Sequence, residues 1–159
     1  MRSVLVLALA VCAQGAAAQT VAGSAASTRA PAGNPVTVES YYRAKWGSAE
    51  EFKKLYRKNE ASMLIEMQRQ GFIKELRFDE PFTHIPGDNR WDIRATIVYR
   101  DAPAAVELGG AWDEAWEATS KRLRPDKKVL DAEEKRRFEL LEDHWDIIVS
   151  SFDPKPSSP

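Results

Sequence analysis

His84 and His144 are the only histidines in this sequence of 159 residues. Metal and haem sites usually combine several ligands at matched spacings, and the chain contains no His-x-x-His, Glu-x-x-His or paired-cysteine pattern. His84 stands among turn residues ahead of a strand, where it could act as a general base, and Asp92 is a second candidate for that role. The alternative is that these side chains only form structural hydrogen bonds. The sequence predicts neither a metal site nor a cofactor.

A second set of candidates consists of polar residues that alternate with apolar residues along the expected strands. They are Glu39, Tyr41, Arg43, Glu75, Arg77, Asp92, Arg94 and Asp146. A period of two places all of them on the sheet face turned away from the helices. Tyr41, Arg43, Arg77 and Arg94 could there bind a small polar ligand, and Tyr41, Arg77 or Arg94 could hold an oxyanion. The alternative is a solvated face with cross-strand ion pairs.

The stretch Val36 to Phe78 reads as one complete strand, helix, strand unit. Apolar residues at alternate positions predict a strand from Val36 to Trp46. A capping box formed by Ser48 and Glu51 then begins a helix, which ends at Gly71 before a strand from Phe72 to Asp79.

The second half of the chain repeats this plan. Turn residues 86–89 predict a hairpin that leads into a strand over residues 91–99, followed by a helix that is capped by Asp101, contains Gly109 and Gly110, and ends near Pro125. A short extra helix begins at the capping box Asp131 to Glu134, and it is expected to bury Phe138 and Leu141 while Lys135, Arg136 and Arg137 point outward. A last strand, residues 145–149, follows, and the five tryptophans lie on apolar phases that predict core packing.

This order is βαββαβ, which predicts an α+β, ferredoxin-like, two-layer sandwich with a four-stranded antiparallel sheet and helices on one face. The body from Val36 to Phe152, most clearly Tyr41-Tyr-Arg-Ala-Lys-Trp46 and the capped amphipathic helix after it, resembles the dimeric αβ-barrel superfamily in its architecture. The resemblance implies that two such sheets pack face to face in a homodimer. Members of the superfamily include cofactor-free monooxygenases, haem enzymes and proteins without known activity, so the resemblance selects no single function.

The N-terminus resembles a secretory signal peptide. Arg2 precedes an apolar run, Val4 to Cys12, that is too short to span a bilayer, and small residues 16–18 predict cleavage after Ala18. A lipid-attachment cysteine at Cys12 is the alternative. The predicted organisation is a signal peptide at 1–18, a flexible leader at 19–34, one domain at 35–154 and a disordered tail at 155–159. We therefore expect a periplasmic or secreted protein without a membrane segment after cleavage, and without a cysteine for a disulfide or a nucleophile.

Charge and composition limit the partners. The formal net charge is −1, which does not provide the basic excess that nucleic-acid binding requires. Because the sequence has no nucleophile, metal set or phosphate-binding glycine loop, the first hypothesis is a non-catalytic homodimer that binds a small polar ligand. The alternative is an enzyme that resembles cofactor-free monooxygenases or isomerases and acts on a small aromatic or quinone-type substrate.

Export is directly testable. Mass spectrometry of the protein recovered from periplasm or culture supernatant should give Gln19 as the mature N-terminus. An intact Met1, or a diacylglycerol on Cys12, would contradict this prediction.

Overall fold

The computed structural model describes residues 33–150 of the chain. The predicted signal peptide, most of the predicted leader and the predicted tail therefore lie outside the described residues. The elements, in chain order, are β1 (Val36–Ala44), α1 (Ala49–Tyr56), the π-helical segment η1 (Arg57–Ala61), α2 (Ser62–Arg69), β2 (Ile73–Asp79), the 3₁₀ turn η2 (Gly87–Asn89), β3 (Ile93–Tyr99), α3 (Ala102–Val106), α4 (Ala111–Leu123), α5 (Lys127–Glu139) and β4 (Leu141–Val149).

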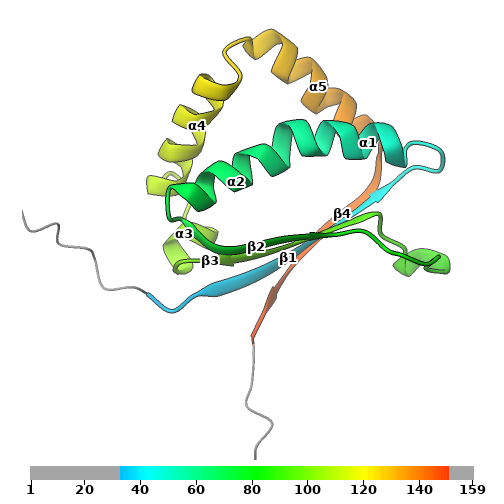
Figure 1. The fold of residues 1–159 in the computed structure, drawn as a ribbon, viewed down its shortest axis with the longest axis horizontal. Coiled ribbons are helices and arrows are strands. Elements are labelled where there is room, and N and C mark those ends of the chain that lie inside the picture. Colours follow the sequence, from blue (N-terminus) through cyan, green and yellow to red (C-terminus); the bar gives the residue numbers. More distant parts are fainter. Residues whose placement is uncertain (1–32, 151–159) are drawn as a thin grey trace, which may run out of the picture. The chain divides into compact units, whose positions relative to one another are not determined.

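The predicted fold class is confirmed. The four strands form one antiparallel sheet in the order β2, β3, β1, β4, and the helices lie on one side of it (Figure 1). This strand order with βαββαβ connections defines a ferredoxin-like fold. Strand β1 is central, and its residues Ser40, Tyr42 and Ala44 are buried beneath the helices. The opposite side of the sheet, called the open face below, is covered by no element of the described chain.

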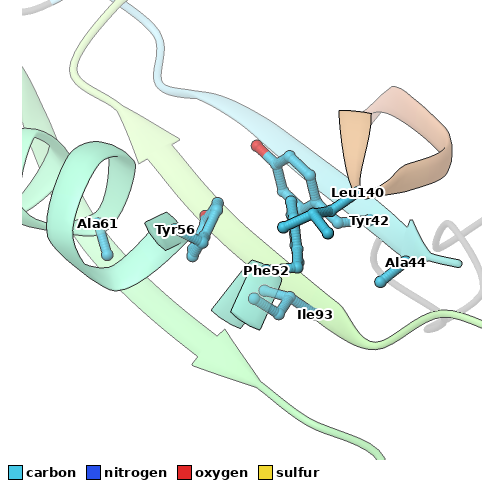
Figure 2. Close-up of a cluster of buried hydrophobic side chains, with 7 residues drawn as sticks. All are labelled: Tyr42, Ala44, Phe52, Tyr56, Ala61, Ile93 and Leu140. Atoms are coloured by element: carbon cyan, nitrogen blue, oxygen red, sulfur yellow. The ribbon is translucent and has the colours of Figure 1, made fainter. Parts of the chain in front are cut away.

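Two apolar clusters join the sheet to the helices. The first surrounds Tyr42 of β1 and comprises Tyr42, Ala44, Phe52, Tyr56, Ala61, Ile93 and Leu140 (Figure 2). The second comprises Leu64, Met67, Phe72, Ile73, Ala95, Ile97 and Ala104. Both draw on the helix pair α1 and α2, whose apolar residues recur at three- and four-residue spacings.

The first helix begins where predicted, but without the predicted capping box. The backbone carbonyl of Ser48 accepts from the amide of Phe52, whereas the Ser48 side chain forms no capping hydrogen bond. The Glu51 carboxylate is instead bound by Arg136 of α5, with Nε to Oε1 at 2.7 Å. The sequence pattern assigned this carboxylate to the cap of its own helix, whereas the structure shows it paired with a residue of a distant helix.

The next helical region is divided at Gly109. That residue has a φ of +73°, in the left-handed region that favours glycine, and it separates α3 from α4. Helix α5 begins earlier than predicted, at Lys127, because the Asp126 side chain accepts a hydrogen bond from the amide of Val129. The capping box expected at Asp131 lies inside this helix.

The predicted buried face of α5 was wrong. The Arg137 side chain is only 4% exposed, whereas Phe138 is 57% exposed. Arg137 Nη2 lies 2.6 Å from Oε2 of Glu134 and 3.2 Å from Oε2 of Glu60, so ion pairs fix the rotation of the helix about its axis. Apolar contact is made by Leu140 at the end of the helix.

The tryptophans are also less buried than predicted. Trp46 follows β1 and is 83% exposed, with the guanidinium of Arg90 4.5 Å from its ring centre. Trp91 and Trp145 are partly buried and contact Tyr41 on the open face. Trp112 and Trp116 pack at the edge of the second cluster. The apolar phase of a strand or helix did not distinguish core from surface for these large rings.

Replacing Arg137 should therefore destabilise the fold far more than replacing Phe138. Arg137→Ala leaves two carboxylates without their buried cation, and we expect a loss of about 3 kcal/mol in the free energy of unfolding. Phe138→Ala should cost about 1 kcal/mol or less, since the ring is largely solvated. Urea unfolding measures both, with Lys135→Ala on the exposed side of α5 as the control. A larger loss for Phe138→Ala would contradict the observed orientation of the helix.

Candidate functional site

A cleft lies between the helix-covered face of the sheet and helices α2, α3 and α4. Its volume is about 460 Å³, which is within the usual range of small-molecule sites. Its lining residues are Val38, Ser40, Tyr42, Glu60, Leu64, Ile97, Tyr99, Ala105, Val106, Trp112, Asp113, Trp116, His144, Asp146 and Ile148. We call this cavity the helix-side cleft.

Aromatic rings form one wall of the helix-side cleft. Trp112 stacks on Trp116 with 5.7 Å between ring centres, and it meets Tyr99 edge-on at 5.2 Å. The two tryptophans are one helical turn apart on α4, which places both rings on the side that faces β3. Burial raises the pKa of Tyr99 to about 12, so its hydroxyl stays protonated at neutral pH.

Glu60 contributes a carboxylate to the cleft from the π-helical segment. Its side chain is 24% exposed, and Oε2 lies 3.2 Å from Nη2 of Arg137. Burial raises the pKa of Glu60; Arg137 opposes that effect, while Glu134 and Asp146 add to it. A carboxyl group with a raised pKa inside a cleft is a candidate for proton transfer.

His144 and Asp146 occupy the same face of β4, two residues apart. His144 Nε2 lies 3.4 Å from Oδ1 of Asp146, and the imidazole stacks on the ring of Tyr42 with 4.3 Å between centres. Burial is also the main cause of the raised pKa of Tyr42, which keeps that phenol neutral. The cleft thus combines an imidazole, the three carboxylates of Glu60, Asp113 and Asp146, and aromatic rings within one cavity.

The prediction that Asp146 lies on the open face was wrong. In the observed register Asp146 pairs with Ser40 and His144 with Tyr42, and both partners face the helices. The apolar residues of β4 were expected to face the core, yet Trp145 stacks on Tyr41 on the open face with 5.2 Å between ring centres. A shift of one residue in phase exchanges the two faces of a strand, and β4 is apolar on the side opposite to the helices.

The open face brings together three of the four predicted ligand-binding residues. Arg94 donates from Nε and Nη2 to Oδ2 of Asp79, at 3.1 and 3.0 Å, and Arg77 Nε donates to the same oxygen at 3.0 Å. Tyr41 pairs with Arg94 in the register, and its hydroxyl donates to Oε2 of Glu39 at 2.6 Å. Tyr41, Arg77 and Arg94 therefore already have carboxylate partners on this face.

Arg43, the fourth predicted residue, is placed apart from the other three. Its guanidinium donates to the backbone carbonyl of Asp88, and Nη2 donates to Oδ2 of Asp143 at 3.2 Å. It therefore joins the β2–β3 loop to the start of β4. A ligand-binding role for this set of residues stays a prediction.

His84 and Asp92 line a second cavity, of about 490 Å³, beside the β2–β3 loop. Asp92 is engaged there in structural contacts, since Oδ2 accepts from the amide of Ala44 at 2.8 Å and from Nη1 of Arg90 at 2.8 Å. Arg90 also donates to the carbonyl of Ala44 at 2.7 Å. These contacts fasten the loop to the end of β1, so proton transfer by Asp92 would require breaking them. The catalytic role of His84 or Asp92 remains a prediction.

Sequence reasoning missed Glu60 and the pairing of His144 with Asp146. Asn59 and Glu60 fall at the three- and four-residue spacings of the apolar stripe that includes Phe52, Tyr56 and Met63. These two polar residues could have indicated a site, because positions on the buried face of an amphipathic helix are usually apolar and exceptions often mark functional residues. Within residues 33–150, no group of three or more histidine, cysteine or acidic side chains is arranged to hold a metal ion. None of the helices described in that range is long and apolar enough to cross a membrane.

Comparison with known proteins finds similarity in architecture. No protein-family profile matches the sequence, and no curated protein sequence matches it. An uncharacterised NIPSNAP domain protein from Burkholderia xenovorans aligns with 17% identity and a TM-score of 0.43, over 78% of this chain and 100% of the other. A putative antibiotic biosynthesis monooxygenase from Nitrosomonas europaea aligns with 13% identity and a TM-score of 0.45, over 78% and 96%. A dimeric protein of unknown function with a ferredoxin-like fold, from Bacteroides fragilis, aligns with 8% identity and a TM-score of 0.42, over 74% and 96%.

The raised pKa of Glu60 predicts a pH dependence of stability. The folded chain binds the Glu60 proton more tightly than the unfolded chain, so this group's contribution to the free energy of unfolding falls as pH rises from the ordinary value of 4.5 through the raised pKa. Glu60→Gln removes the titration. The difference in free energy of unfolding, wild type minus Glu60→Gln, should therefore decrease as the pH rises above the ordinary value of 4.5.

Urea unfolding at a series of pH values measures this difference. Glu114→Gln, on an exposed position of α4, is the matched control and should give a difference that changes little with pH. A constant difference for Glu60→Gln, or one that increases with pH, would show that the pKa of Glu60 is not raised.

Proposed function

We propose that this protein binds a small molecule with an apolar or aromatic body in the helix-side cleft. The observation that carries the proposal is the meeting of Glu60, His144 and Asp146 with the rings of Trp112 and Trp116 around one cavity of about 460 Å³. Small-molecule sites typically have apolar walls and a few polar groups that fix the orientation of the ligand. This location differs from the open face, where Tyr41, Arg77 and Arg94 already pair with carboxylates.

A second candidate function is acid–base catalysis in the same cleft. Glu60, whose carboxyl has a raised pKa, lines the cavity together with His144, whose Nε2 lies 3.4 Å from Asp146. A bound substrate could lose a proton to one of these groups and receive one from another. Glu60→Gln preserves the shape of the site and removes its titration. A loss of turnover much larger than the loss of ligand affinity would support catalysis, whereas a ligand that is bound and never converted supports binding alone.

Filling the cleft should weaken ligand binding. Val106 lines the mouth of the cleft and is exposed, so Val106→Phe adds bulk there without disturbing the core. Affinity for small aromatic probes should fall about tenfold or more, measured by ligand-detected NMR or by the fluorescence of Trp112 and Trp116. Ile65→Phe, at an exposed position of α2 that does not line the cleft, is the control. Equal affinities of the two variants would contradict binding at this site.

We also propose that the open face forms a homodimer. Tyr41 and Trp145 stack there, the edge of the Trp91 ring meets Tyr41, and Ile147 is exposed beside them. A sheet with one aromatic, uncovered face is commonly completed by a second copy across a two-fold axis. Together with the signal peptide proposed at residues 1–18, this describes an exported homodimer with one ligand cleft in each subunit.

The dimer can be tested by light scattering on residues 35–159 at tens of micromolar protein. The expected mass is that of two chains, and Ile147→Lys should shift it toward one chain because a charge would enter the interface. Ile65→Lys, on the helix layer, should leave the mass unchanged. A one-chain mass for the wild type would count against the homodimer.

A further inference from the structure

The charges around the helix-side cleft all have one sign. Three carboxylates face it from three different elements: Glu60 from the π-helical segment, Asp113 from α4 and Asp146 from β4. Its lining contains no lysine and no arginine. The one lining residue that can become cationic is His144.

These carboxylates are only partly neutralised by the protein. Arg137 lies 3.2 Å from Glu60 but only 2.6 Å from Glu134, so its single charge is divided between two carboxylates. Asp113 accepts a hydrogen bond from the backbone amide of Gly109 at 2.6 Å. Among the described residues, neither Asp113 nor Asp146 forms an ion pair with a lysine or an arginine. A cation in the cleft would therefore meet the charges of Asp113 and Asp146, which no lysine or arginine compensates among the described residues.

The aromatic wall favours the same kind of ligand. The faces of tryptophan and tyrosine rings are regions of negative potential, and they attract ammonium groups within about 6 Å of the ring centre. Trp112, Trp116 and Tyr99 are held against one another beside the carboxylates. Rings and carboxylates together form the type of cage that recognises alkylated ammonium ions.

Other ligand classes fit this cavity less well. An anion would enter a site lined by three carboxylates with no free guanidinium or ammonium to pair with it, which is electrostatically unfavourable. A neutral apolar ligand would remove water from the carboxylates without replacing it by an interaction. A volume of about 460 Å³ accommodates a compact cation with a short apolar or aromatic substituent.

We propose that the ligand of the helix-side cleft is a small organic cation, in which an amine or methylated ammonium group is attached to an apolar or aromatic body. This inference rests on the proposed binding function and adds the chemical class of the ligand. In the complex, the cationic group lies between the carboxylates and the rings of Trp112 and Trp116, and the apolar body extends along β1 and β3.

Three ring compounds that differ in charge test the proposal: benzyltrimethylammonium, benzyl alcohol and benzoate. Each is titrated into the full chain at one pH and one ionic strength, with ligand-detected NMR as the readout. The cation should bind about tenfold or more tightly than the alcohol, and benzoate should bind most weakly. Choline and its uncharged isostere 3,3-dimethylbutanol form a second pair of nearly equal shape, for which the same preference is expected.

Substitutions in the cleft test whether its carboxylates cause the preference for the cation. Asp146→Asn and Asp113→Asn should each weaken benzyltrimethylammonium binding several-fold and leave benzyl alcohol binding almost unchanged, because each removes a charge and keeps the side chain's size. Asp131→Asn, on the outside of α5, is the control and should change neither affinity. If the cation preference survives in both cleft variants, these carboxylates are not its cause and the proposal is overturned.

The failure of this inference is distinguishable from the failure of the proposed function. If benzyl alcohol or benzoate binds as tightly as the cation, and Val106→Phe weakens that binding, the cleft is a ligand site but the cation inference is wrong. If none of the probes binds, or if Val106→Phe changes no affinity, both proposals are wrong.

Discussion

The arrangement of the helices above the sheet depends on a buried cation. Arg137 connects α5 with the π-helical segment through Glu60 and with its own helix through Glu134. Further polar contacts join α5 and its connection to the first helix pair, among them Arg136 with Glu51 and Arg124 with the carbonyl of Asn59. Apolar packing of α5 is concentrated at its end, where Leu140 joins the first cluster, while Val129 and Phe138 are exposed. Removing Arg137 would leave Glu60 and Glu134 without their buried cation, so the packing of α5 on the first helix pair is sensitive to this one side chain.

The π-helical segment connects the ion pairs of Arg137 with the helix-side cleft. A π-helical turn contains one residue more per hydrogen-bonded ring than an α-helical turn, and it rotates the residues after it about the helix axis. Segment η1 lies between α1, which contributes Phe52 and Tyr56 to the first cluster, and α2, which contributes Leu64 and Met67 to the second. Glu60 lies in this segment, so its carboxylate reaches both Arg137 and the cleft. Such segments frequently occur at functional sites, where a local irregularity directs a side chain that a regular helix would place elsewhere.

Much of the fold could be predicted from the sequence, whereas the candidate site could not. The strands over residues 36–44 and 93–99 follow an alternating pattern because one face of each is buried by helices, and local turn residues mark their ends. Strand β2 departs from the predicted alternation, since a register shift between Ile73 and Glu75 lets Ile73 join Phe72 in the core. The prediction failed where long-range contacts decide the orientation. In β4 the apolar residues Trp145 and Ile147 face away from the helices, and in α5 the buried residue is Arg137. Hydrophobic periodicity shows that an element has two faces, but the neighbouring elements decide which face is inside.

The error in β4 is informative because this strand carries residues of both surfaces. His144 and Asp146 point to the helix-side cleft, while Trp145 and Ile147 lie between them in sequence and face the opposite side. β4 is an edge strand, so β1 is its only hydrogen-bonded neighbour in the described sheet. Anything that covers the open face would also restrict the backbone that positions His144 and Asp146. The geometry of the cleft and the covering of the open face are therefore coupled through one strand, in which alternate residues serve the two surfaces.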